Sequence, residues 1–317
     1  MGKAKNAWGA VFILVLVVAA CAGCGGTIIP PKEISGDLVA CFIDVGQGDA
    51  CLVRCPDGTS MLIDAGPAHD GAAVIDSLHA AGVTRIDHLI FTHPHEDHIG
   101  GGEAVLAAFD VGKVYMPRTS HTTSTYEHLL EAIQAQGLTI TEARAGTALL
   151  DLANLDARFV GPTEDYEAVN DCSAVVFLQY ASRTFIFAGD ASITAEADML
   201  DGGWVAHADC LKVGHHGSAT STGQPFLDVV GPHVAIISVA AANSYGHPAP
   251  ATLERLEGVG ATIYRTDQSG TITVTSDGTS LEVQVAGARV ATGTGQQNNR
   301  GAVSQWSVGC SRQSACA

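Results

Sequence analysis

The chain has 317 residues, of which 46% are hydrophobic and 15% are charged, and its formal net charge is −17. This composition is typical of a folded globular protein and excludes a disordered chain. The excess of acids repels nucleic-acid phosphates, so it excludes a protein that coats DNA through a basic surface.

The first 26 residues predict a targeting segment. Lys3 and Lys5 precede an apolar stretch at 7–20, which is short for a membrane span. The stretch runs into "VAAC", which resembles a bacterial lipoprotein signal with Cys21 as the lipid-bearing residue. Cys24 is an alternative lipid site, and an ordinary cleaved secretory peptide and an uncleaved anchor are further alternatives. Each alternative places the folded part at the extracellular face of the cytoplasmic membrane, lipid-anchored or secreted.

Three further regions follow the targeting segment. Residues 27–37 are rich in Gly and Pro and predict a linker. Residues 38–286 predict one folded domain, because apolar runs recur throughout them. Residues 287–317 are rich in Gly, Ser and Gln without any period, and they predict a disordered tail.

Strands and helices alternate along the predicted domain. β-branched and aliphatic runs bounded by Gly, Pro and Asp predict the strands. In the first half, strands are expected at 38–46, 50–55, 60–66, 85–93 and 113–117, and helices at 72–82, 100–109 and 125–137. In the second half, strands are expected at 156–162, 173–180, 183–190, 209–216, 233–241, 261–266, 270–276 and 280–287, and helices near 193–201, 222–230 and 250–258. This order predicts an α/β domain with its helices outside.

Metal-ligand side chains are concentrated in "THPHEDHIGG" at 92–101. His93 and His95 are two apart at a strand end, so both can face one ion, and Asp97 and His98 can hold a second ion. Imidazole nitrogens and carboxylate oxygens are good ligands for zinc and similar ions. The glycines at 100–102 allow close backbone approach. The stretch therefore predicts a site for two divalent metal ions.

The same stretch matches the HxHxDH motif of the metallo-β-lactamase superfamily. Further motifs occur in the order seen in the extracellular hydrolase domain of ComEC-type competence proteins. They are "DVGQGDA" (44–50), "LIDAG" (62–66), "FAGDAS" (187–192), "LKVGHHGSATS" (211–221) and "NSYGHP" (243–248). The resemblance covers about residues 38–286. It implies an αββα four-layer sandwich, with two mixed sheets face to face and the site at one edge.

The resemblance also implies a role for each matching residue. The expected metal ligands are His93, His95, Asp97, His98, Asp190 and His216, with Asp190 bridging the two ions. The expected catalytic residues are Asp97, His215 and His247. The adjacent pair His215 and His216 leaves open which one is the ligand, although His216 is favoured. Asp64 and Asp49 are expected to orient the ligands.

One region departs from the common superfamily pattern. Many zinc enzymes of the superfamily have another His before the bridging Asp, whereas this chain has Asn170, Asp171 and Ser173. This difference favours fewer protein ligands for the first metal, a weaker affinity, or manganese over zinc. The expected cofactors are therefore two divalent ions, Zn²⁺ or Mn²⁺.

The implied function is hydrolysis by a hydroxide that two metal ions activate. A phosphodiesterase or nuclease acting on extracellular DNA or another phosphodiester is favoured, with Lys212 or Arg265 attracting the substrate and with steep inhibition by salt. An acyl hydrolase of lactamase or lactonase type and a non-catalytic surface lipoprotein are the alternatives. The remaining histidines lack partner spacing and are expected to be structural or solvated. They are His69, His79, His88, His121, His128, His207 and His233.

Overall fold

The computed structural model describes residues 34–285 and 288–292. The predictions for the signal segment, Cys21 and Cys24 lie outside these residues, as does most of the predicted linker and tail. Within the described part of the chain, no helix is both long and apolar enough to cross a membrane.

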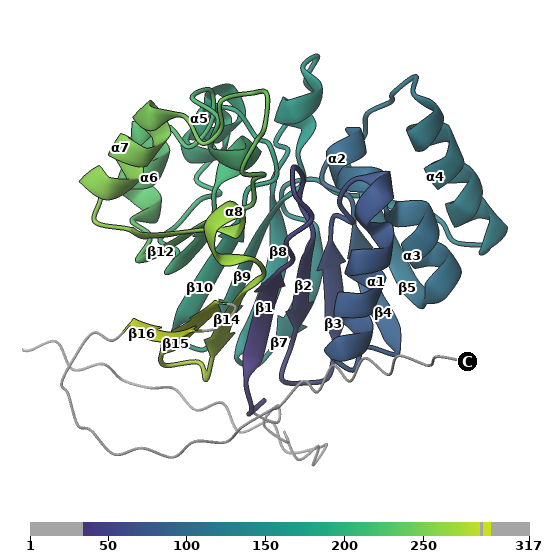
Figure 1. Cartoon of the computed structure of the whole chain (residues 1–317), viewed down its shortest axis with the longest axis horizontal. Coiled ribbons are helices and arrows are strands. Elements are labelled where there is room, and N and C mark those ends of the chain that lie inside the picture. Colours follow the sequence, from purple (N-terminus) through teal and green to yellow (C-terminus); the bar gives the residue numbers. More distant parts are fainter. Residues whose placement is uncertain (1–33, 286–287, 293–317) are drawn as a thin grey trace, which may run out of the picture. The chain divides into compact units, whose positions relative to one another are not determined.

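Two mixed sheets form the centre of the described residues (Figure 1). The first has the strand order β16-β15-β14-β1-β2-β3-β4-β5-β6, and the second has the order β13-β12-β11-β10-β9-β8-β7. The first sheet consists of β1 (Leu38–Phe42), β2 (Cys51–Arg54), β3 (Ser60–Ile63), β4 (Arg85–Ile90), β5 (Asp110–Met116), β6 (Ile140–Glu142), β14 (Ile272–Ser276), β15 (Leu281–Val285) and β16 (Ala288–Thr292). The second consists of β7 (Ala148–Leu152), β8 (Leu155–Gly161), β9 (Val175–Tyr180), β10 (Arg183–Phe187), β11 (Cys210–Lys212), β12 (Val234–Ile237) and β13 (Thr262–Arg265).

Helices connect the strands in both halves. The α-helices are α1 (Gly71–Ala80), α2 (Glu96–Ile99), α3 (Gly102–Ala108), α4 (Ser124–Ala135), α5 (Ile193–Asp201), α6 (Gln224–Val230), α7 (Pro250–Gly258) and α8 (Thr266–Ser269). The 3₁₀ helices are η1 (Ala68–Asp70), η2 (Val169–Cys172) and η3 (Gly214–Gly217). Thr123 and Ser192 cap α4 and α5 with side-chain oxygens that accept backbone N–H groups.

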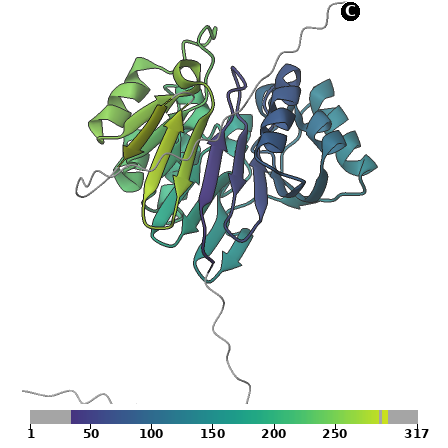
Figure 2. The same cartoon turned by 60° about the horizontal axis from the view of Figure 1, so that its bottom comes forward.

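Three apolar clusters define four layers. Phe42, Phe159 and Phe187 belong to a cluster that joins the facing sides of the two sheets. A second cluster packs α1, α3 and α4 on the first sheet, and a third packs α5, α6 and α7 on the second sheet. Helices therefore cover the outer face of each sheet (Figures 1 and 2). This arrangement confirms the predicted αββα sandwich.

Several elements differ from the prediction. The short strands β6, β7 and β16 and the one-turn helices α2 and α8 were not expected. All three residues of β6 are exposed, so no apolar alternation marks that strand. Residues 288–292 pair antiparallel with β15, so the prediction of disorder from residue 287 is wrong for this segment. The predicted strands at 38–46, 85–93 and 209–216 end several residues early, and their remaining residues form loops.

The parallel strands place those loops at the edges of the sheets. β4 pairs parallel with β3 and β5, and β10 pairs parallel with β11. The loop after β4 carries the opening histidine motif, the loop after β10 carries Asp190, and the segment after β11 carries His215 and His216. Carboxyl ends of parallel strands are a common place for functional residues.

Candidate metal centre

The histidine motif lies at the turn between β4 and α2. His95 is the extended residue that precedes α2, and Asp97 and His98 lie within that helix. The backbone here packs tightly, because a Cβ on Gly101 would lie 2.2 Å from the carbonyl oxygen of Ala65. Only glycine fits at this position, which explains the glycines that follow the motif.

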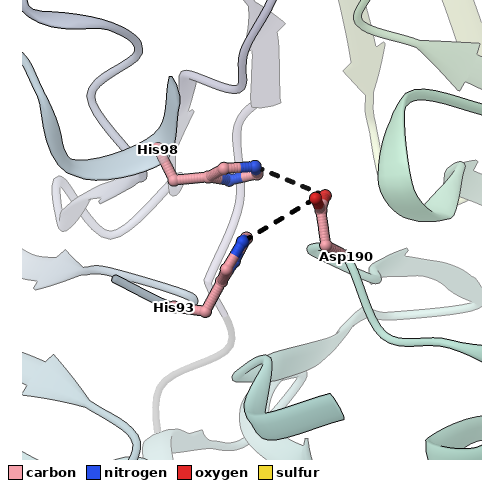
Figure 3. A group of neighbouring side chains, drawn as sticks. All are labelled: His93, His98 and Asp190. Atoms are coloured by element: carbon pink, nitrogen blue, oxygen red, sulfur yellow. Dashed lines mark ion pairs between the residues drawn. The ribbon is translucent and has the colours of Figure 1, made fainter. Parts of the chain in front are cut away.

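Asp190 presents one carboxylate oxygen to each of two buried histidines (Figure 3). Its Oδ1 lies 3.3 Å from His98 Nε2, and its Oδ2 lies 3.7 Å from His93 Nε2. The backbone N–H of Asp190 donates to Ser173 Oγ over 3.0 Å, which fixes the start of this loop. Asp190 lies about a hundred residues from the two histidines in the sequence, and the fold brings its carboxylate to them.

His215 and His216 point in different directions from consecutive left-handed backbone positions. Their φ angles are 49° and 53°, a conformation that costs roughly 1–3 kcal/mol for each non-glycine residue. His216 is buried, and its Nε2 lies 3.3 Å from Asp97 Oδ2 and 3.8 Å from Asp190 Oδ1. The side chain of His215 is 25% exposed, and its Nε2 lies 3.6 Å from Asp190 Oδ2.

These contacts separate the expected ligands into two sets that share Asp190. The first set contains His93 Nε2 and His95 Nδ1, which are 2.9 Å apart, together with Asp190 Oδ2. The second set contains Asp97 Oδ2, His98 Nε2, His216 Nε2 and Asp190 Oδ1. The first set contains three of the expected ligands and the second contains four, with Asp190 counted in both.

Neighbouring groups orient the histidine rings. Asp64 Oδ2 lies 2.8 Å from His98 Nδ1, and both Asp64 oxygens accept hydrogen bonds of 2.7 Å from Thr92. His216 Nδ1 lies 3.0 Å from the carbonyl oxygen of Ser238. If the Nδ1–H groups of His98 and His216 donate in these contacts, the Nε2 atom of each ring keeps a lone pair that can bind a metal ion.

The second set fits a divalent cation. His98 Nε2, His216 Nε2 and Asp190 Oδ1 are buried and have no hydrogen-bond partner, although they converge. Burial lowers the pKa of His216, but the charges of Asp190 and Asp49 outweigh burial and raise it to about 10. Burial likewise opposes ionisation of Asp97, yet His216 and His98 hold its pKa at about 2. The surroundings thus favour positive charge between these side chains, which a metal ion would supply.

A pocket of about 680 Å³ opens beside the two sets. Its lining includes His95, Asp97, Asp190, His215, His216 and His247 among the predicted site residues. His93 and His98 lie beneath it and are fully buried. Burial lowers the pKa of both His215 and His247, which favours their neutral forms.

Three sequence predictions about this pocket are wrong. His121 was expected outside the site, but it lines the pocket and its ring centroid lies 5.7 Å from that of His95. Lys212 was expected to attract substrate, but it is buried and its Nζ lies 2.7 Å from Asp49 Oδ2. Arg265 pairs with Asp267 at 2.6 Å and does not line the pocket.

The structure adds lining residues that the motifs did not indicate. Asn170 Nδ2 lies 3.4 Å from the His215 ring, and Asn170 belongs to the region where the sequence departs from the superfamily pattern. Tyr245 and His69 also line the pocket. Tyr245 lies within "NSYGHP", but no spacing rule separates it from an ordinary surface tyrosine.

A third group of potential ligands lies away from the pocket. His207 Nε2 and His233 Nδ1 lie 3.7 and 3.5 Å from Asp209 Oδ1, and both histidines are exposed. The Asp209 carboxylate already accepts hydrogen bonds from Arg183 and Thr184. The Asp209 carboxylate therefore has protein partners besides the two histidines, which the sequence predicted to be structural or solvated.

Comparison with known proteins places the chain in a family. It matches the family model described as the metallo-beta-lactamase superfamily over residues 43–241. It is 33% identical over 249 residues to ComE operon protein 3 of Bacillus subtilis (strain 168), covering 73% of this chain and 32% of that protein. It is 30% identical over 232 residues to Competence protein ComA of Neisseria gonorrhoeae, covering 72% of this chain and 31% of that protein.

The chain therefore spans about a third of the length of these curated relatives. The crystal structure of the metallo-beta-lactamase fold protein YhfI from Bacillus subtilis is 12% identical with a TM-score of 0.48, covering 74% of this chain and 99% of that one. Because the family model matches more than half of the sequence, this chain belongs to the metallo-β-lactamase superfamily.

Proposed function

We propose that this protein is a metal-dependent phosphodiesterase that acts on DNA or another phosphodiester outside the cytoplasmic membrane. The observation that carries the proposal is the sharing of Asp190 between two ligand sets at the floor of an open pocket. Two divalent ions, when bound, would lower the pKa of water and stabilise charge on the attacking and leaving oxygens of a phosphodiester.

The chain's own residues would position the substrate. His215 and His247 line the pocket, and their ring centroids lie 5.4 Å apart. From there, either neutral imidazole can donate a hydrogen bond to a non-bridging oxygen, and its protonated fraction can protonate the leaving group, a contribution of roughly 10²–10⁴ in rate for a well-placed acid. Asn170 contacts the His215 ring and would hold it toward the pocket.

The names of the relatives support a substrate of this class. Two of them are named a competence protein and ComE operon protein 3, and the chain resembles the hydrolase domain of ComEC-type DNA-uptake proteins. The motifs around His215 and His247 favour phosphodiesters over lactams and lactones only through that resemblance.

The test uses the protein reconstituted with zinc or manganese. We expect hydrolysis of bis-p-nitrophenyl phosphate and of DNA, with little hydrolysis of nitrocefin. His215→Ala and His247→Ala should lose turnover while remaining folded by circular dichroism. A folded, metal-loaded preparation that opens nitrocefin or a lactone but leaves every phosphodiester intact would establish the acyl-hydrolase alternative instead.

We also propose that the chain is anchored at the extracellular face of the cytoplasmic membrane through a lipid on Cys21. The support is the sequence "VAAC" after a short apolar stretch. The protein expressed in bacteria should incorporate a fatty-acid analogue and partition into detergent, and Cys21→Ala should abolish both. Label that survives in Cys21→Ala but is lost in Cys24→Ala would assign the lipid to Cys24.

A further inference from the structure

An aromatic side chain stands exposed at the pocket. Tyr245 is 69% exposed and lines the pocket together with Asp190, His215 and His247. Among the described residues, the other large apolar side chains that are exposed are aliphatic: Ile140, Leu152, Ile193 and Val229. An exposed tyrosine ring is common, but this one lies beside the candidate metal centre rather than on a remote surface.

The tyrosine ring has a defined orientation. It stacks on His247 with the ring centroids 5.7 Å apart and the planes at 25°. His247 in turn packs edge-on against His215, whose Nε2 lies 3.6 Å from Asp190 Oδ2. A row of three rings therefore leads from the shared carboxylate to Tyr245.

The loop that carries Tyr245 is held in place by one side chain. Asn243 Oδ1 accepts the backbone N–H groups of Tyr245 and His247 over 3.2 and 3.0 Å. Asn243 Nδ2 donates to the carbonyl oxygens of Ala240 and His247 over 2.9 and 2.7 Å. Because these four contacts order the loop before any ligand arrives, little conformational entropy remains to be lost on binding.

The charges of the pocket favour contact with a nucleobase over contact with the phosphate backbone of a nucleic acid. Its described lining contains no Lys or Arg, and the whole chain carries a net charge of −17. Phosphate contacts by cationic side chains, which supply most of the affinity of ordinary nucleic-acid binders, are therefore missing from this lining. Stacking on an aromatic face is independent of such charges and serves any base.

We propose that Tyr245 forms a base-stacking subsite that takes a nucleobase of a single-stranded nucleic acid next to the phosphodiester held at the metal centre. The inference rests on the proposed phosphodiesterase function and names its substrate class. A base within a duplex is already stacked on both faces, so a single strand or a frayed end is the form that this ring can engage.

The experiment compares two single-stranded substrates of equal length: oligothymidylate, and the same backbone with abasic tetrahydrofuran residues. Both carry the same phosphates, so only the bases differ. Tyr245→Ala should lower kcat/KM on oligothymidylate by roughly 10- to 100-fold, the range found when a base-stacking aromatic is removed. Tyr245→Phe, which keeps the ring, should retain the wild-type value. The wild type should cleave the abasic strand slowly, and Tyr245→Ala should slow it no further.

Val229→Ala provides the matched control, because Val229 is an exposed apolar residue on α6 outside the pocket lining. It should behave as wild type on both strands. Equal losses on both strands in Tyr245→Ala would mean that the ring only supports His247, and this would overturn the subsite. Unchanged rates on both strands would also overturn it. In either case, cleavage of bis-p-nitrophenyl phosphate by the wild type would still support the proposed phosphodiesterase function. A wild type that cleaves no phosphodiester would contradict both that function and the base-stacking subsite.

Discussion

A single carboxylate, Asp190, connects the two ligand sets, so its removal should damage both. Asp190→Ala removes the oxygens that face His98 and His93 at 3.3 and 3.7 Å. We expect the variant to lose at least one metal ion per chain after reconstitution, and to lose more than about 100-fold in activity, since even outer groups of such sites matter by 10–100-fold. Elemental analysis after gel filtration measures the metal.

His128→Ala is the control for this experiment. His128 lies exposed on α4 and takes no part in the pocket lining. It should bind as much metal as the wild type. If Asp190→Ala retained the wild-type metal content while folded, the shared-carboxylate arrangement would be wrong.

Asp64 contacts an expected metal ligand, His98, and is not itself among the expected ligands. It has a left-handed backbone with φ of 59°, and its Oδ2 lies 2.8 Å from His98 Nδ1. Asn tolerates this backbone conformation, so Asp64→Asn should fold while losing the charged acceptor for His98. We expect metal affinity to fall by roughly 10- to 100-fold. Competition with a chromogenic chelator measures the change, and an unchanged affinity would exclude an orienting role for Asp64.

The predicted site residues that the structure brings together belong to compact local motifs. The spacing within residues 93–98 is enough to predict that these side chains gather, because neighbouring side chains at a strand end must share one region. The burial of Lys212 and its pairing could not be predicted from local spacing. Its partner Asp49 lies on a distant segment, and only the tertiary structure shows that the two are paired and buried. His121 was missed for the same reason, since nothing in its local sequence connects it to His95.

At the next scale, η3 depends on the close approach of Gly217 to the loop at Pro248. Gly217 has a φ of 82°, and a Cβ there would lie 2.6 Å from Pro248 Cβ. Gly217→Ala should lower the unfolding free energy by about 1–2 kcal/mol or more from the backbone alone, and the melting temperature by roughly 2–8 °C. The activity of the folded variant should also fall, because Ala249 N–H donates to Gly217 O and this contact positions the neighbouring His247.

Gly258→Ala is the matched glycine control. Gly258 ends α7, and a Cβ there would meet nothing within 4 Å. Its replacement should leave activity unchanged and stability unchanged or raised by up to about 1 kcal/mol. Thermal melts and turnover of bis-p-nitrophenyl phosphate compare the two variants. Equal behaviour of Gly217→Ala and Gly258→Ala would contradict the close approach.

The segment that follows η3 is held by a buried carboxyl on α5. Glu196 accepts the backbone N–H groups of Thr222 and Gly223, and burial raises its pKa from 4.5 to about 7. Because the folded-state pKa is the higher one, this group's contribution to stability is fully present below pH 4.5 and is lost as the pH rises through 7.

Glu196→Gln should therefore remove one component of the pH dependence of stability. Between pH 4.5 and 8, the stability of the wild type relative to the variant should fall by up to roughly 3 kcal/mol. Denaturant unfolding of both metal-free proteins at several pH values measures this difference, and comparison of the two cancels the titration of all other groups. Parallel pH profiles would contradict a raised pKa for Glu196.

Elements were predictable where apolar periodicity was strong. The helices α5 and α7 were predicted with the same bounds that the structure shows, because each has an apolar face and a clear start at Ser192 or Pro250. β6 and β7 were missed, since they lie at sheet edges, are short and keep most of their side chains exposed. Edge strands depend on pairing with a neighbour, which no local pattern reveals.

The net charge of the whole molecule and the composition of its pocket both indicate few contacts between cationic side chains and phosphates. The chain carries a net charge of −17, and the two cations expected to attract DNA are engaged with Asp49 and Asp267. The described pocket lining contains neither Lys nor Arg. Few phosphate contacts can then release counterions on binding, and general repulsion between the protein and DNA weakens as salt screens it.

We therefore expect a shallow salt dependence in place of the steep inhibition that free lysine and arginine side chains would produce. For the metal-saturated enzyme on single-stranded DNA, KM should change by less than about threefold between 50 and 200 mM KCl, as for one phosphate contact or fewer. Steady-state kinetics across this range, with bis-p-nitrophenyl phosphate as the small-substrate reference, measure the slope. A rise in KM of about 10³-fold or more, as for six to ten phosphate contacts, would show that cationic side chains outside the described pocket bind the strand.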